Sequence, residues 1–98
     1  MARHPDRKPS HPGELLREIV LPALDRPKAE IARLLGISRE SLYRILDEAQ
    51  PVTPVMAAKL GKLCGNGSGL WIRMQAAFDQ WQVDHTVGVS GIPTLEDA

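Results

Sequence analysis

PKAEIARLLGISRESLYRIL, residues 27–46, contains two short runs of helical apolar periodicity separated by a glycine. The apolar positions expected to line one face of each helix are Ile31, Ala32, Leu34 and Leu35 before the glycine and Leu42, Ile45 and Leu46 after it. Gly36 tolerates the positive φ of a tight helix exit, and Ser38 can cap the second helix by accepting from the N–H of Glu40 or Ser41. Helix, short turn and helix together predict a helix-turn-helix unit, a motif that DNA-binding proteins use.

The rest of the chain has the size and composition of one small helical domain. It holds 98 residues, and aromatic residues make up only 4% of them, so strand-forming side chains are scarce. We therefore expect an all-α fold, a five-helix bundle over residues 12–83. Flexible tails are expected at residues 1–11 and 84–98; for the first, a basic arm that touches DNA or a partner is the alternative.

Turn and capping signals place the other three helices. The first should span about residues 12–21, with Glu14 reaching back to free N–H groups and Pro22 marking its end. Its expected buried residues are Leu15, Leu16, Ile19 and Val20. Asp25 or Arg26 should cap the first helix of the central pair, which ends near Leu35, and the second should run from Arg39 to about Asp47.

Thr53 as N-cap and Pro54 at the first helical position predict a fourth helix, which ends at Gly65. Its apolar face should contain Met56, Leu60, Leu63 and Cys64. A fifth helix should run from Ser68 or Gly69 to Val83, and residues 86–89 could form a short strand. The fifth helix carries one apolar and aromatic stripe: Leu70, Trp71, Met74, Phe78 and Trp81. Such a stripe is typical of core, but a bundle this small cannot bury all of it, so part is expected to form a dimer interface.

Charge and cysteine content limit the functional classes. The formal net charge is zero, which is unusual for a DNA-binding protein, although residues 1–50 hold nine of the twelve Lys and Arg residues. One cysteine excludes an intramolecular disulfide, and no long apolar segment or signal-peptide pattern is present. We expect a cytoplasmic protein without a membrane partner.

No residue pattern indicates catalysis, a cofactor, a metal site or a small-molecule substrate. The three histidines lie in or beside the tails, without a spacing that would hold a metal ion. Cys64 is expected to be a buried, inert thiol. The glycine-rich residues 65–69 lack the lysine of a phosphate loop and should only connect two helices. The sequence therefore predicts a binding protein rather than an enzyme.

If the second helix of the central pair lies in the major groove, its early exposed side chains face the base edges. Arg39 could pair with guanine, Glu40 could accept from cytosine, and Tyr43 and Arg44 lie next to them. The full set of expected DNA-contacting residues is Lys28, Ser38, Arg39, Glu40, Ser41, Tyr43 and Arg44. For Glu40 the alternative role is a charge that matches the helix dipole, and for Arg44 an ion pair with Glu40 or Glu48.

The chain also resembles the HigA-type antitoxins, a branch of the Cro/XRE helix-turn-helix proteins. The resemblance is carried by HPGELLRE (residues 11–18), EIA through LGISR (30–39), RIL (44–46), QPVTP (50–54) and LW with MQ and D (70–79). It implies a five-helix homodimer that binds a RelE-like mRNA-cleaving toxin and represses its own operon by binding operator DNA.

Three positions depart from the family pattern. Pro27-Lys28 replaces a polar cap and Gln, Asp47-Glu48-Ala49 replaces an Asn and a basic residue, and Gly69 replaces an acidic one. Acidic groups near the DNA backbone should weaken DNA binding. Two alternatives therefore remain: a stand-alone transcription regulator with no toxin, and a helical scaffold whose helix-turn-helix no longer meets DNA.

Overall fold

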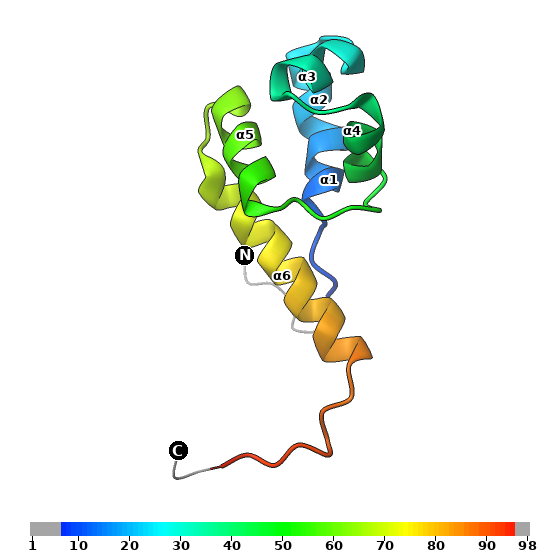
Figure 1. Cartoon of the computed structure of the whole chain (residues 1–98), viewed down its shortest axis with the longest axis vertical. Helices are drawn as coiled ribbons and strands as arrows, with labels where there is room; N and C mark the ends of the chain where they lie inside the picture. Colours follow the sequence, from blue (N-terminus) through cyan, green and yellow to red (C-terminus); the bar gives the residue numbers. More distant parts are fainter. Residues whose placement is uncertain (1–6, 96–98) are drawn as a thin grey trace.

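The computed structural model describes residues 7–95, and within them the chain forms five helical segments (Figure 1). The first segment joins α1 (Pro12–Leu15), a π-helical turn η1 (Leu16–Val20) and α2 (Leu21–Leu24). The others are α3 (Lys28–Leu35), α4 (Arg39–Leu46), α5 (Pro54–Cys64) and α6 (Ser68–Thr86). The predicted all-α fold is confirmed.

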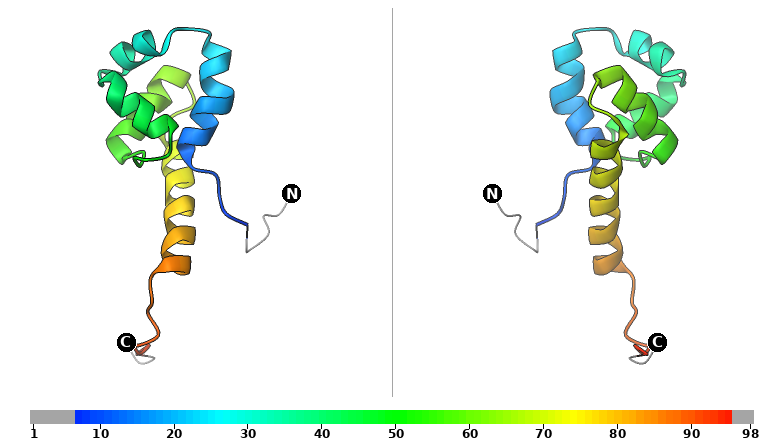
Figure 2. Two further views of the ribbon diagram at one scale, coloured as in Figure 1. Left: turned by 90° about the vertical axis from the view of Figure 1, so that its right-hand side faces the viewer. Right: turned by 90° about the vertical axis from the view of Figure 1, so that its left-hand side faces the viewer.

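The segments before α6 pack together into a unit that we call the head, residues 12–64. The α6 helix begins beside α5 and runs out of the head, so that its C-terminal half has no other helix beside it (Figures 1 and 2). Lys8 and His11, which precede the first helix, contact aromatic rings on this projecting part. The longest helix of the protein is therefore only half covered by the head.

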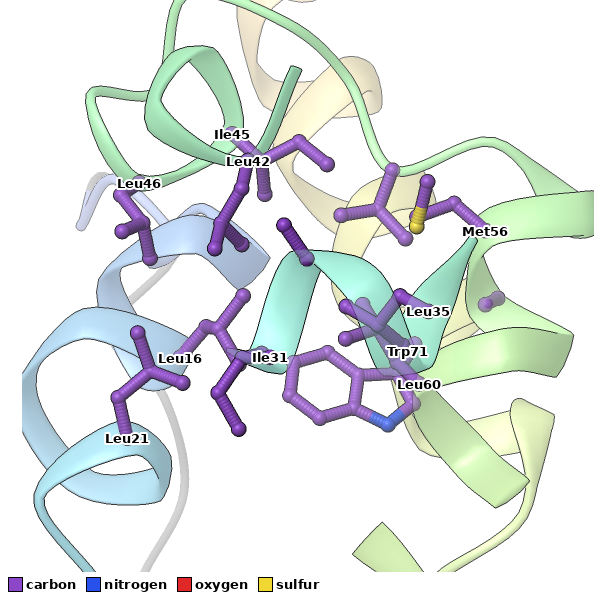
Figure 3. Packing of buried hydrophobic residues seen from close by; sticks show 13 residues of the cluster. Leu16, Leu21, Ile31, Leu35, Leu42, Ile45, Leu46, Met56, Leu60 and Trp71 are labelled. Atoms are coloured by element: carbon purple, nitrogen blue, oxygen red, sulfur yellow. The ribbon is translucent and has the colours of Figure 1, made fainter. Parts of the chain in front are cut away.

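The core lies between the head helices and the first turns of α6 (Figure 3). Its fully buried large side chains include Trp71, Leu16, Ile31, Leu42, Ile45 and Leu60. Each such side chain stabilises the fold by roughly 1.5–3 kcal/mol relative to exposure. The Trp71 ring is the largest of them, and its Nε1–H donates to Asn66 Oδ1 at 3.2 Å, so the one polar atom of the ring is also paired.

The capping predictions for three turns are confirmed. Gly36 ends α3 with φ 70°, a conformation that glycine adopts without steric strain. The Ser38 side chain accepts from the Ser41 N–H at 3.0 Å at the start of α4. The Thr53 hydroxyl accepts from the Met56 N–H at 3.2 Å at the start of α5, with Pro54 as its first residue.

The first helical segment differs from the prediction because it passes through Pro22 and ends at Asp25, which has φ 50°. The π-helical turn supplies the reason. The Leu21 N–H bonds to Leu16 O, five residues back, and Pro22 then falls in the first turn of α2, where a missing N–H costs no helical bond. The same turn rotates the apolar face, so that Leu16 and Leu21 are buried while Ile19 is 61% exposed.

Four smaller predictions were wrong. Neither Asp25 nor Arg26 caps α3, since Pro27 occupies the N-cap without a side-chain bond. Leu34 lies on the outer side of α3 and is 49% exposed. The last helix continues past Val83 to Thr86. No strand is present between residues 7 and 95, so the predicted strand at 86–89 is replaced by the last helical residue and an extended segment.

Candidate nucleic-acid interface

The α3–turn–α4 unit presents one face of α4 to solvent and buries the other. Leu42, Ile45 and Leu46 are buried against the head. The side chains of Arg39, Glu40, Tyr43 and Arg44 are exposed, and Tyr43 retains 47% of its surface. The structure therefore brings these four predicted contact residues together on one outward face.

The remaining predicted contact residues lie at the two N-terminal ends of the unit. Ser38 is exposed and Ser41 half-buried, and their hydroxyls are 3.1 Å apart. Lys28 is the first residue of α3 and is exposed. Its ammonium group therefore lies near a helix N-terminus, where backbone N–H groups also favour an anion such as a phosphate.

The outer charges of α4 interact only weakly with one another. Arg44 Nη2 lies 3.9 Å from Glu40 Oε2, one helical turn away, and both side chains are largely exposed. An exposed pair of this kind contributes about 0.3–0.5 kcal/mol. Arg44 can therefore leave Glu40 for a phosphate at little cost.

The position of α4 is fixed by a close approach to the first helix. A Cβ atom on Gly13 would lie only 1.9 Å from the backbone carbonyl oxygen of Ile45. Next to this contact the ring of His11 caps the first helix, because its Nδ1 accepts from the Gly13 N–H at 2.9 Å. The HPGE segment thus starts the first helix and leaves room for α4.

The acidic residues after α4 have a structural role in addition to their charge. Glu48 adopts φ 60°, and its carboxylate lies 3.5 Å from Arg17 Nη1. The same guanidinium donates to Leu46 O at 2.5 Å, one of the carbonyl groups left unpaired at the end of α4. Hydrogen bonding to Glu18, with help from Glu48, raises the pKa of Arg17. Both acids are exposed, but Glu48 is paired with Arg17, whereas Asp47 forms no ion pair with another of residues 7–95.

The predicted dimer-interface residues do not share one environment. Trp71 is fully buried, so it belongs to the core of its own chain and has no surface to offer a partner. Leu70, Met74, Phe78 and Trp81 are half-buried. Part of the Phe78 and Trp81 surface is covered by residues before the first helix: Lys8 Nζ lies 5.2 Å from the Phe78 centroid and 5.6 Å from that of Trp81.

His11 makes a structural contact between the first helix and α6 that the sequence did not reveal. Its ring is buried and meets Phe78 edge-on with centroids 5.0 Å apart. Burial lowers its pKa, while Glu48 and Asp79 act in the opposite direction and Lys8 adds to the lowering. The position of His11 directly before Pro12 would have indicated this contact only if histidine were considered as a possible helix N-cap. Histidine is uncommon at N-caps.

Within residues 7–95, the structure shows neither a metal-binding cluster nor an activated thiol. No group of three His, Cys, Asp or Glu side chains within residues 7–95 could hold a metal ion. Cys64 is half-buried, and burial raises the pKa of its thiol, which keeps the nucleophilic thiolate scarce. Of the helices between residues 7 and 95, none has the length and apolar character needed to span a membrane.

Comparison with known proteins supports the same class. No family model matches the chain. The HTH-type transcriptional regulator YddM of Escherichia coli is 32% identical over 95 residues, which cover 97% of this chain and 95% of YddM. Antitoxin HigA-1 of Vibrio cholerae is 28% identical over 79 residues, covering 81% and 74% of the two chains.

A solved structure extends the similarity to the whole fold. The antitoxin GraA, determined in complex with its operator, superposes with a TM-score of 0.83 at 28% identity. The match covers 99% of this chain and 100% of GraA. The α6 helix thus lies within the matched region, together with the head.

Proposed function

Because the chain belongs to the family of helix-turn-helix regulators that includes the HigA-type antitoxins, we propose that it binds operator DNA as a dimer, represses its own operon and neutralises a RelE-like toxin. The observation that supports DNA binding best is the outward face of α4. Arg39, Glu40, Tyr43 and Arg44 are exposed there on a helix that its buried face and Gly13 hold in place. In a dimer, two such helices would enter successive major grooves about 34–36 Å apart.

The low net charge sets a limit on this binding. Lys28, Arg39 and Arg44 are the exposed cations of the unit's DNA face, and few phosphate contacts mean a shallow salt dependence. Glu48 opposes binding less than its charge suggests, since Arg17 lies beside it. The proposed contacts thus place more weight on base recognition than on non-specific attraction.

A gel-shift titration with the DNA upstream of the gene, at two salt concentrations, tests the repressor role. We expect a shift that competitor DNA of unrelated sequence does not abolish. No shift at the lower salt concentration, with a folded protein, excludes operator binding. If the chain then still co-purified with a toxin, the helical scaffold alternative would hold.

A stand-alone regulator is the second candidate, because the relative YddM is named an HTH-type transcriptional regulator, although it is uncharacterised. The two candidates differ in the neighbouring gene. An antitoxin should have a small basic reading frame beside it, and co-expression of both frames should relieve the growth arrest that the neighbour causes alone. Absence of such a frame, with operator binding intact, favours the stand-alone regulator.

A further inference from the structure

Residues 87–95 continue from the end of α6 and lead away from the head (Figure 1). We call them the C-terminal segment. Every residue in it is exposed. Its large apolar side chains keep between 55% and 74% of their surface; they are Val87, Val89, Ile92 and Leu95. Apolar side chains that stay exposed together in one short segment are typical of a site that binds another macromolecule.

The backbone of the C-terminal segment is free to pair with another chain. The Val87 N–H donates to Val83 O at 2.9 Å, and Val87 itself has the extended values φ −99° and ψ 121°. A turn follows, in which the Ile92 N–H donates to Val89 O at 2.9 Å. Residues 88–95 make no other backbone hydrogen bond within the described range 7–95. Val87 and Val89 are two positions apart, so an extended chain places them on one face.

Charge is divided between the two ends of the molecule. Residues 1–73 hold all twelve Lys and Arg and eight of the twelve acidic residues, which gives a formal net charge of +4. Residues 74–98 hold the other four acids and no Lys or Arg, which gives −4. Asp84, just before the C-terminal segment, forms no ion pair with another of residues 7–95. An acidic end repels nucleic acid and attracts a basic protein.

We propose that the C-terminal segment is the docking site for the toxin, a basic protein, and that it adds a strand to an exposed sheet edge of that partner. Backbone hydrogen bonds would hold the segment there, Val87 and Val89 would fill pockets on one face, and Asp84 would lie near cations of the partner. This inference rests on the proposed function for the partner's identity and adds the surface that binds it.

The proposed docking site leaves the DNA face of the chain accessible. The recognition helix α4 belongs to the head, whereas the C-terminal segment lies beyond the far end of α6 (Figure 1). Toxin and operator DNA would therefore bind at opposite ends of the chain. Substitutions in the C-terminal segment should weaken toxin binding and leave the gel shift with operator DNA unchanged.

Calorimetry with the full chain and the purified product of the small basic reading frame beside its gene tests the docking site. Val89→Ser should weaken binding by about tenfold, because one buried valine side chain is lost. Val55→Ser is the matched control: Val55 is 68% exposed, but on the head, and the affinity should not change. Circular dichroism verifies that each variant is folded.

Neutralising Asp84 tests the contribution of charge. Asp84→Asn should slow association with the same basic protein and make the affinity less sensitive to salt. Asp47→Asn is the matched control, because Asp47 is also exposed and without an ion pair among residues 7–95, but lies on the head. Its association rate and salt dependence should equal those of the wild type. Equal behaviour of the two variants would contradict the electrostatic part of the inference.

Hydrogen exchange locates the contact without a substitution, since strand addition should protect amides of residues 88–95 when the basic protein is added. Binding by the wild type without this protection, or equal affinity of Val89→Ser and wild type, overturns the docking site alone. Absence of the neighbouring reading frame, or a product that the wild-type chain does not bind, overturns the docking site together with the toxin partnership. The gel shift tests repression separately in either case.

Discussion

Arg39 and Lys28 should contribute to DNA binding in different ways. Arg39 is exposed in the first turn of α4, where a guanidinium can pair with a guanine. We expect Arg39→Ala to reduce discrimination at one base pair by about 1–3 kcal/mol. Lys28→Ala should lower affinity for all sequences and reduce the salt slope by about one. Gel shifts with single-base operator variants at several salt concentrations separate the two effects; equal loss on every sequence would contradict the role of Arg39.

His11 should make stability depend on pH. Its Nδ1 accepts the Gly13 N–H, so the cap requires the neutral ring, and burial lowers the folded-state pKa below the usual 6.5. The unfolded chain therefore binds a proton first as pH falls, and the stabilisation present above about pH 6.5 decreases below it. We expect a lower melting temperature at pH 5.5 than at pH 7.5.

The control for this prediction is His11→Asn, which can still cap the helix but does not titrate. At pH 7.5 the variant should melt at a lower temperature than the wild type, because its contact with Phe78 is lost. Between pH 5.5 and pH 7.5 its melting temperature should change less than that of the wild type. An equal pH dependence in both proteins would assign the effect to groups other than His11.

The first helical segment shows how one local irregularity changes a whole helix face. A regular helix over residues 12–24 would place Ile19 beside Leu16 and would require an N–H from Pro22. The π-helical turn inserts one residue into the repeat, which turns Ile19 outward, brings Leu21 inward and moves Pro22 to a first turn. Helical periodicity alone could not predict this, because the pattern of apolar residues fits both registers.

Gly13 should tolerate no side chain where the first helix crosses α4. Because a Cβ atom on residue 13 would lie only 1.9 Å from Ile45 O, Gly13→Ala must push the two helices apart. We expect a loss of about 1–3 kcal/mol in the free energy of unfolding. Chemical denaturation measures it, with Gly91→Ala as control because nothing lies within 4 Å of that site. Equal stability of both variants would show that the helices move without cost.

Sequence reasoning succeeded where neighbouring residues determine the structure and failed where distant ones do. The turn at Gly36 and the caps at Ser38 and Thr53 depend on residues a few positions apart. The Arg17 bonds to Leu46 and Glu48 join positions some thirty residues apart, and no local pattern encodes them. The exposed face of α4 could likewise be predicted from spacing, although its contacts with DNA stay a prediction.

The aromatic stripe of α6 shows the same limit. Its helical spacing was evident, but the sequence could not tell which residues the chain would cover by itself. Trp71 is enclosed by the core, while Lys8 and His11, some seventy residues away in sequence, lie against Phe78 and Trp81. Because these side chains are covered within the chain, the apolar residues of α6 that stay exposed are Ile72, Ala76 and Val83.

The unbroken length of α6 has a consequence for operator architecture. The helix spans 19 residues without a kink-forming proline. If the dimer forms through α6, as we expect from its apolar and aromatic stripe, the helix would act as a rigid spacer between the two heads. Each inserted residue would lengthen that spacer by about 1.5 Å and rotate one head by about 100° relative to the other. The number of base pairs between half-sites would thus depend on a helix other than the recognition helix, and operator spacing could diverge among relatives whose recognition helices stay the same.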